Sequence, residues 1–242
     1  MKIYYLFGIL LTFLASCVGK EVKSNLNEEK SIEFPTKING QLSKFPLKSA
    51  DFSIDSLYFA NDSTFKFSRG NLDIETVKLL SKKLSADEIT TREKYYLNDF
   101  YQVQEAKEKG KFDQFKKKLD IGMTENAVCN TIGRIEYGDS AALLLWEIVY
   151  KSYDACPFYF GHDVMGTLVK KGKVISCITL AAKESGADTP MSYEMYQLVK
   201  MDEFGQIFIK NHSQTSEEYT VIEKSKFASR YKINSFGFEW QK

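Results

Sequence analysis

In the C-terminal part of the chain, apolar and polar positions alternate in short runs, a pattern typical of β-strands. The run Leu143–Tyr150 is almost wholly apolar, which predicts a central strand. Turn residues separate the later runs, and apolar positions at Phe236, Phe238 and Trp240 predict that the chain ends in a strand. We therefore expect residues 141–242 to form an antiparallel β-meander.

Several shorter segments complete this expectation. Small and turn-forming residues predict a loop at Ser185–Pro190. Two separate short strands are predicted at Tyr219–Ile222 and Tyr231–Ile233. Earlier in the chain, Phe52–Phe59 predicts a strand that forms a hairpin with a second strand at Phe65–Phe67.

In residues 72–133, apolar side chains recur at the spacing of helices and not of strands. Ser85 and Glu88 have the spacing of a capping box, and Gly110 suits the end of a helix. Apolar side chains recur at helical spacing in four groups: Val77, Leu80 and Leu84; Tyr96, Phe100 and Val103; Phe112, Phe115 and Leu119; Val128 and Ile132 after the cap Thr124. The expected class is therefore α+β, with an N-terminal helical layer packed on the C-terminal antiparallel β-meander.

The first residues have the pattern of an export signal. Lys2 precedes an apolar run, Ile3–Phe13, and small residues then lead to a cysteine in Leu14-Ala15-Ser16-Cys17. This stretch resembles the lipobox of bacterial lipoproteins, in which the cysteine is lipidated and the chain is cut just before it. The resemblance implies that residues 1–16 are a signal peptide. It also implies that Cys17 carries fatty acyl chains such as palmitate and binds the membrane through them.

Other interpretations of residues 1–16 are a short transmembrane helix and a secretory signal that is cut elsewhere. A spanning helix needs about 20 apolar residues, more than this run supplies. Residues 17–49 are polar and charged at first, so we expect a flexible tether before a single globular domain at residues 50–242. Val18 is not the aspartate that retains some lipoproteins at the inner membrane, which favours the outer membrane of the cell envelope.

The charge balance excludes a strongly basic or acidic partner for the whole chain. The sequence has 33 basic and 32 acidic residues, and removal of Lys2 with the signal leaves a neutral chain. Nucleic-acid binding needs a basic excess, so no nucleic-acid partner is expected. The densest basic run, Lys116–Lys118, fits a solvated helix face.

Three cysteines remain besides Cys17, so at most one disulfide can form within the chain. Cys129 and Cys177 lie near apolar residues, and buried thiols are the favoured interpretation. A disulfide between Cys156 and Cys177 is the alternative, because an exported protein can form one.

The sequence has no established catalytic motif, metal motif or nucleotide-binding motif. Asp154, Cys156, His162 and Asp163 are the one group that resembles metal ligands, but their spacing matches no defined site. No metal, cofactor or catalytic residue is therefore expected. Asp154, Tyr159 and His162 are candidates to line a functional loop. The second histidine, His212, stands alone in the sequence.

A second, local resemblance covers residues 110–180. Gly122-Met123-Thr124-Glu125, Val128 and Ile132-Gly133, followed by Trp146 in a strand and by Gly172-Lys173-Val174, resemble the SmpA/OmlA-type envelope lipoproteins. The chain departs from that family at Arg134, with no proline nearby, and continues with more strands. The resemblance implies a short helix at residues 124–133 against a small sheet, and a non-catalytic role in binding or assembly.

We therefore expect a lipid-anchored, non-enzymatic envelope protein that binds or assembles with another protein, of which an inhibitor or immunity protein is one variant. This hypothesis predicts an exposed edge strand or a large apolar patch. An alternative is a small-molecule binding lipoprotein, because 14% of the residues are aromatic and could line a concave sheet. That alternative predicts a pocket of ~300–1,000 Å³. A hydrolase would need His162 or His212 in a cleft beside a nucleophile.

Overall fold

The computed structural model describes residues 35–60, 72–84, 89–119, 124–137, 141–152 and 158–241. These residues belong to one unit, Phe34–Lys242. Several expectations of the sequence fall on residues outside the described ranges: residues 1–18 with Cys17, then Phe65, Phe67, Ser85, Glu88, Gly122, Met123, Asp154 and Cys156.

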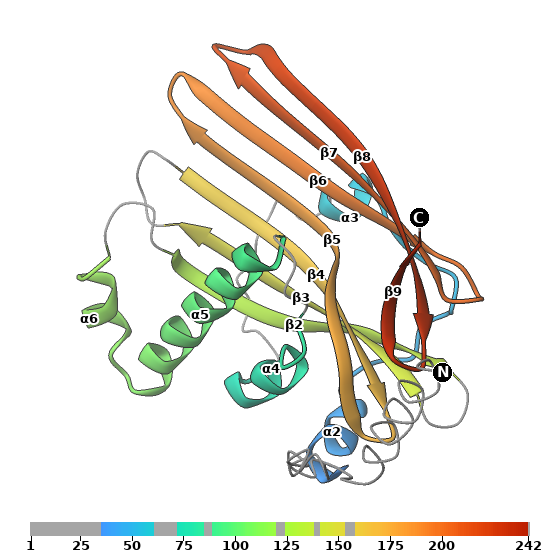
Figure 1. The fold of residues 1–242 in the computed structure, drawn as a ribbon. Helices are drawn as coiled ribbons and strands as arrows, with labels where there is room; N and C mark the ends of the chain where they lie inside the picture. Colours follow the sequence, from blue (N-terminus) through green and yellow to red (C-terminus); the bar gives the residue numbers. More distant parts are fainter. Residues whose placement is uncertain are drawn as a thin grey trace, which may run out of the picture. The chain divides into compact units, whose positions relative to one another are not determined.

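A single antiparallel sheet dominates the described residues. Eight strands follow one another across the sheet in the order β2-β3-β4-β5-β6-β7-β8-β9, and β1 pairs with β6 off this path (Figure 1). The strands are β1 Phe52–Ile54, β2 Thr124–Tyr137, β3 Ala141–Ser152, β4 Phe158–Lys170, β5 Lys173–Asp188, β6 Met191–Met201, β7 Gln206–Glu217, β8 Thr220–Asn234 and β9 Gly237–Gln241.

The expected α+β class, a helical layer packed on a meander, is wrong, because the described chain is mostly sheet and its helices are few. The antiparallel sheet itself is confirmed. The helices are α2 Pro35–Leu42, α3 Ser56–Ala60, α4 Ile74–Leu80, α5 Ile89–Glu108 and α6 Phe112–Lys116.

The helix expected at residues 124–133 is the largest single error. This segment is the first half of β2 and pairs along its length with β3. A register shift between Thr131 and Gly133 changes which side chains face each side of the sheet. Ala127 and Cys129 therefore face the helices, whereas Ile135 faces the other side. This shift interrupts the period of two that would identify a strand in the sequence.

The structure also corrects three other secondary-structure predictions. Residues Ser56–Ala60 form α3, so only Phe52–Ile54 of the expected strand is a strand. The loop expected at Ser185–Pro190 is mostly strand, because β5 continues to Asp188 and pairs with both β4 and β6. The two short strands expected near the C-terminus are one strand, β8, which follows β7 from end to end.

The first core lies between one face of β2–β5 and the helices α2, α4 and α5. α5 crosses that face over β2 (Figure 1), with Phe100 buried against it. Trp146 and Tyr150 on β3 are almost fully buried in the same cluster. Asp73 caps α4, because its carboxylate accepts a hydrogen bond of 2.7 Å from the backbone amide of Thr76.

The second core lies where the sheet divides. β5 pairs with β6 only through Ala182–Asp188, and beyond that point β1 takes the place of β5 beside β6. Apolar side chains from both branches fill the space between them: Ile54, Phe59, Ile135, Leu143, Leu145, Val164, Leu180, Val199, Met201, Ile207 and Ile209. This division gives one sheet two separate apolar cores.

Part of the expected tether belongs to the fold. Within residues 17–49, the helix α2 and the segment after it are described, and Ile38 and Phe45 are buried in the first core. The guanidinium of Arg134 donates hydrogen bonds of 2.8 Å and 3.1 Å to the carbonyl oxygens of Leu42 and Phe45. Any tether is therefore confined to residues before this helix.

Gly161 provides a test of the packing between β3 and β4. It lies opposite Tyr150, and a Cβ at residue 161 would come within 1.9 Å of the Tyr150 Cζ. The Tyr150 ring is buried and its hydroxyl donates to Glu184 at 3.1 Å, so the ring cannot move freely. Gly161→Ala is expected to lower the free energy of unfolding by about 1–3 kcal/mol in urea titrations.

Gly40 is the matched control for that substitution. A Cβ there meets no atom within 4 Å, so Gly40→Ala in α2 should leave stability unchanged or raise it slightly. Equal stability of the two variants would contradict the proposed collision with Tyr150.

Candidate interaction edge

The strand β8 has an open side. β7 pairs with it through Thr220–Lys232, with one register shift that leaves Ile222 unmatched, but β9 covers only Arg230–Asn234 on the other side. No strand among the described residues pairs with the open side of residues 220–229. Residues 220–228 are exposed to solvent, so none of the described segments covers this stretch. We name residues 220–229 the open edge.

The hydrogen bonds of β8 show which residues face outward. The backbone amide of Ile233 donates to the Gly205 carbonyl oxygen on the β7 side, at 3.0 Å. In an antiparallel pair alternate residues bond to each neighbour, and the β7–β8 register has no shift from Gln206↔Lys232 to Thr215↔Glu223. The register shifts only beyond this stretch, where Ser216 lies opposite Val221. Odd-numbered residues therefore bond to β7. Lys224, Lys226 and Ala228 direct their backbone N–H and C=O groups away from the sheet.

From Glu223 onward, even-numbered and odd-numbered side chains of the open edge project from opposite faces of the sheet. Even-numbered residues share a face with the even-numbered residues of β7, as the Arg230 guanidinium shows by lying 5.4 Å from the Phe208 ring centroid. Lys224 and Lys226 therefore project from that face. The odd-numbered face carries Phe227, whereas the register shift places Val221 opposite Ser216, on the other face.

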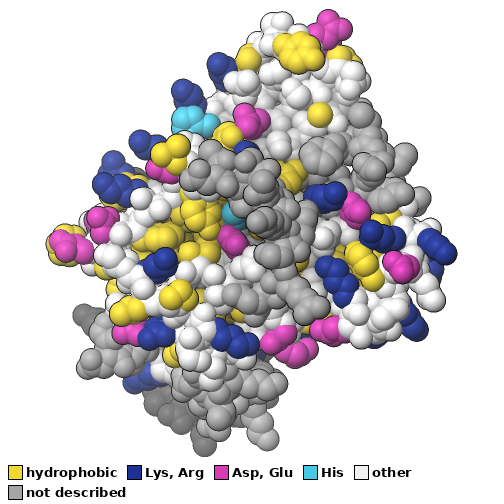
Figure 2. Space-filling model, turned by 180° about the vertical axis from the view of Figure 1, so that it is seen from behind, with side chains coloured by type: hydrophobic (Ala, Val, Ile, Leu, Met, Phe, Trp, Pro, Cys, Tyr) yellow, Lys and Arg dark blue, Asp and Glu magenta, His cyan; other side chains and the backbone are white. Residues whose placement is uncertain are grey.

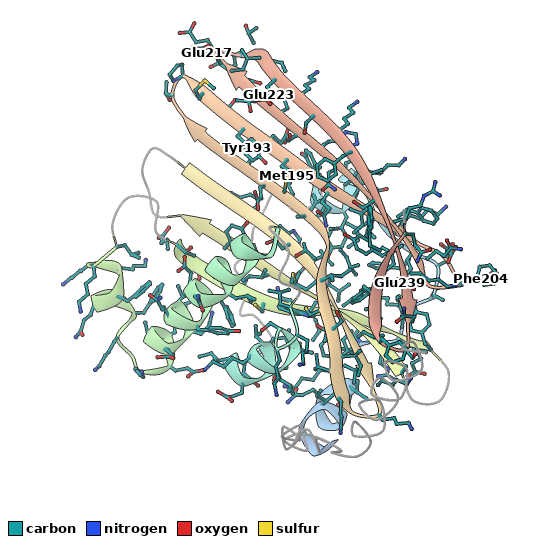
Figure 3. All side chains as sticks on the ribbon, in the orientation of Figure 1. Tyr193, Met195, Phe204, Glu217, Glu223 and Glu239 are labelled. Atoms are coloured by element: carbon teal, nitrogen blue, oxygen red, sulfur yellow. The ribbon has the colours of Figure 1, made fainter. Side chains whose placement is uncertain are left out.

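Lys and Arg side chains gather along the rim where β8 lies in the space-filling view (Figure 2). The acidic Glu217 and Glu223 lie at the hairpin end of β7 and β8 (Figure 3). The middle of the open edge is therefore basic.

At the opposite edge of the sheet, other segments of the chain cover parts of β2. On the outer side of β2, the Arg134 amide donates to the Pro46 carbonyl oxygen, and the Lys48 amide donates to that of Arg134, both at 2.8 Å. Further along, the Leu72 amide donates to the Cys129 carbonyl oxygen at 3.2 Å. Segments of the chain thus cover β2 where β8 is left open.

The buried polar network around Glu147 is the second candidate site. Its Oε2 accepts a hydrogen bond from the Tyr58 hydroxyl and lies 2.8 Å from the His162 Nε2. Its Oε1 accepts from the Asn130 amide at 3.1 Å. Burial acts to raise the pKa of Glu147, but the hydrogen bonds and electrostatic attraction of His162, with those of Tyr58 and Asn130, outweigh it and lower the pKa.

This network joins α3 to the sheet and does not form an accessible reaction site. The His162 side chain is 2% exposed, and the Phe59 ring packs edge-on against it with a centroid separation of 5.2 Å. Tyr58 and Phe59 belong to α3, whereas Glu147 and His162 belong to β3 and β4. The carboxylate therefore holds a short helix over the sheet.

The residues that resembled metal ligands are not brought together within the described chain. His162 and Asp163 are consecutive in β4 and project from opposite faces of the sheet. Among the described residues, no three His, Cys, Asp or Glu side chains form a group that could hold a metal ion. The candidate loop residue Tyr159 lies in β4, and its side chain is outside the described part. His212 lies in β7 opposite Lys226.

The buried-thiol interpretation is confirmed for Cys129, which is a free cysteine with its pKa raised by burial. Cys177 is also buried, and its Sγ lies 3.4 Å from the Thr167 hydroxyl. Lys116, from the basic run, lies in α6 within 3.8 Å of Glu125, so it contributes to a surface ion pair.

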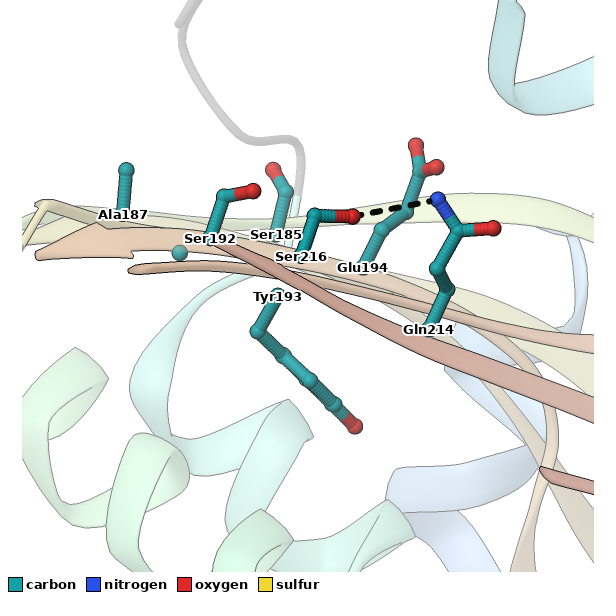
Figure 4. Close-up of a pocket in the computed structure, with 8 residues that line it drawn as sticks. Ser185, Ala187, Ser192, Tyr193, Glu194, Gln214 and Ser216 are labelled. Carbon is teal, nitrogen blue, oxygen red and sulfur yellow. Dashed lines mark hydrogen bonds between the residues drawn. The ribbon is translucent and has the colours of Figure 1, made fainter. Parts of the chain in front are cut away.

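Two surface hollows bear on small-molecule binding. One of about 320 Å³ lies at the far end of β5–β7, where Ser185, Ser192, Glu194 and Gln214 project from one face and Tyr193 from the other (Figure 4). The other, of about 280 Å³, is lined by Tyr137, Ala141, Leu168, Lys170, Phe204, Gly205, Ile233, Asn234 and Ser235. Both open to solvent, whereas drug-sized ligands bind mostly enclosed apolar pockets.

Comparisons with protein families, with curated proteins and with solved structures find no match to this chain. None of the helices in the described ranges has both the length and the apolar character needed to cross a bilayer.

The open edge is not predicted by the pattern of apolar and polar residues. The available signal was the polar run between Ile222 and Tyr231, which suggested a break between two short strands. A strand without a buried face has no apolar alternation, so its pattern is that of a loop.

Proposed function

We propose that this protein is a lipid-anchored, non-enzymatic envelope protein that binds a protein partner along the open edge of β8. The observation that carries the proposal is the unpaired backbone of residues 220–229, a stretch of roughly 30 Å at strand spacing. An added strand would gain main-chain hydrogen bonds along this length, and side chains on alternate positions would set its specificity.

The contrast between the two sides of the sheet supports a role for the open edge. Exposed edges promote unwanted pairing, and proteins usually cover them or keep them short. Here chain segments cover β2, whereas β8 extends ten residues past the end of β9. The open edge is therefore available for pairing with a strand of another chain.

Membrane attachment enters the proposal through Cys17. The lipobox-like stretch predicts acylation of this residue, and each buried CH₂ adds about 0.8 kcal/mol to membrane affinity. Residues before α2 would then space the folded unit from the lipid surface. The outer membrane is the proposed location, because Val18 follows the anchor.

Site-specific photo-crosslinking in cells tests this function. A photo-reactive residue in place of Lys226, in the open edge, should yield one stoichiometric crosslinked protein in the membrane fraction. The same residue in place of Lys173, which is exposed at the start of β5, is the matched control and should yield none. Cys17→Ser should remove both the protein and its crosslinked product from that fraction.

Equal crosslinking from both positions, or none from residue 226 at high efficiency, would contradict binding at the open edge. Retention of the Cys17→Ser variant in membranes would contradict the lipid anchor separately.

A further inference from the structure

We propose that the partner segment is an extended strand in which acidic residues alternate with apolar ones. This inference rests on the proposed function and names the chemistry of the partner. It follows from the two faces of the open edge, because an added strand places its side chains on the same two faces as those of β8.

One face of the partner strand would lie beside basic side chains. The even-numbered face of β8 carries Lys224, Lys226, Arg230 and Lys232 and no acidic residue. Lys210 of β7 lies opposite Ala228 on the same face. Directly opposed side chains on paired strands have Cβ atoms about 4.5–5.5 Å apart, so acidic residues at alternate positions would meet these cations.

The other face of the partner strand would lie beside Phe227 and small polar side chains, with Glu223 toward the hairpin end. Phe227 is 55% exposed there. The hydroxyls of Ser213 and Ser225 lie 2.8 Å apart on the same face and bond to each other. Apolar residues at the remaining alternate positions of the partner would cover Phe227.

A second copy of this chain does not fit the open edge. When two identical antiparallel strands pair about a two-fold axis, each residue lies opposite one of the same parity, because opposed side chains share a face. A register centred on Glu223 opposes two glutamates, and one centred on Lys224 opposes two lysines. Centring on Ser225 opposes Lys224 to Lys226 twice. Like charges directly opposite destabilise paired strands, so these lysines select against self-pairing.

Binding of defined peptides to the full lipidated chain in detergent micelles tests the inference. The probes are ten-residue peptides in which valine alternates with glutamate, glutamine or lysine, and affinity is measured by fluorescence anisotropy. The glutamate peptide should bind at least tenfold more tightly than the glutamine peptide at ~0.05 M salt, and the ratio should shrink at ~0.5 M salt. Lys224→Glu with Lys226→Glu should reverse the preference toward the lysine peptide.

Ala228 separates edge pairing from simple charge attraction. Ala228→Pro removes an outward-facing N–H and leaves every charge in place, and an edge strand tolerates proline at such a position. It should abolish peptide binding while far-UV circular dichroism stays unchanged. Ala228→Gly, which keeps the N–H, is the matched control and should bind as the parent chain does.

The outcomes distinguish the two proposals. Equal binding of the glutamate and glutamine peptides, with loss in Ala228→Pro, would overturn the acidic partner and leave the open edge as the site. Peptide binding that is unchanged in Ala228→Pro would contradict the open edge as the binding site. If vesicles containing phosphatidylglycerol displace the bound peptide, the partner would be an anionic lipid surface and not a protein. If the parent chain sediments as a dimer and Ala228→Pro sediments as a monomer, the partner would be a second copy of this chain.

Discussion

Replacement of Glu147 by alanine is expected to lower the free energy of unfolding by about 3–5 kcal/mol, the usual cost of breaking a buried charged pair. The carboxylate accepts hydrogen bonds from Tyr58 and Asn130 and pairs with His162. Its removal deprives three side chains of this acceptor and releases α3 from the sheet. Urea titration followed by far-UV circular dichroism at pH 7 measures the loss.

The same residue makes stability depend on pH in a defined direction. The pKa of Glu147 is lowered in the folded protein, so its stabilisation is present above the ordinary value of 4.5 and is lost as pH falls below it through the folded value. Glu147→Gln should be less stable than the parent chain at pH 7. The difference in unfolding free energy between Glu147→Gln and the parent chain should narrow as the pH is lowered below 4.5.

Glu75 is the matched control for Glu147. Its side chain in α4 is 76% exposed and forms only a surface ion pair with Lys78, so Glu75→Ala should stay within about 0.5 kcal/mol of the parent chain. A loss in Glu147→Ala no larger than this, or a gap in Glu147→Gln that widens in acid, would contradict the proposed role of the network.

Replacement of Trp146 by alanine is also expected to lower the free energy of unfolding by about 3–5 kcal/mol. Trp146 is fully buried among the helices and β3–β4, and the substitution leaves a cavity that surrounding side chains cannot fill. Its indole N–H donates to the Thr167 hydroxyl at 2.9 Å, and that hydroxyl donates to the Leu80 carbonyl oxygen at 3.0 Å. This chain of hydrogen bonds joins α4 to the sheet.

Trp146→Phe separates the ring from the hydrogen bond. It keeps most of the apolar volume and loses the N–H, so it should cost roughly 1–2 kcal/mol. The second tryptophan, Trp240, is 58% exposed in β9, and Trp240→Ala should change stability by no more than about 0.5 kcal/mol. Similar losses for Trp146→Ala and Trp240→Ala in urea titrations would contradict the assignment of Trp146 to the first core.

The elements that the sequence predicted well are those with a buried face. The Leu143–Tyr150 run lies within β3, and the spacing of Phe100 and Val103 matches the buried side of α5. The strand predicted at the end of the chain is β9, and Phe238 packs against the second core. In each of these segments one side contacts a core, so the apolar period records the secondary structure directly.

The segments that the sequence predicted wrongly lack such a simple period. The bulge in β2 moves the apolar positions from one face to the other, and residues 124–133 consequently match a helix by spacing alone. Ser185–Asp188 has the composition of a loop, yet the ladders on both sides keep it in β5. Pairing with neighbouring strands, which no local pattern contains, decided both segments.

The sequence by itself determined an N-terminus that resembles a lipobox, the near-neutral charge, and an antiparallel sheet rich in apolar side chains. Only the tertiary structure decided which strand is left unpaired, because strand order depends on contacts between distant parts of the chain. It also placed Lys224 and Lys226 on one face beside an open backbone, and it placed His162 against Glu147 rather than in a cleft. Residues of one type along a sequence become a site only when pairing and burial bring them to the same face.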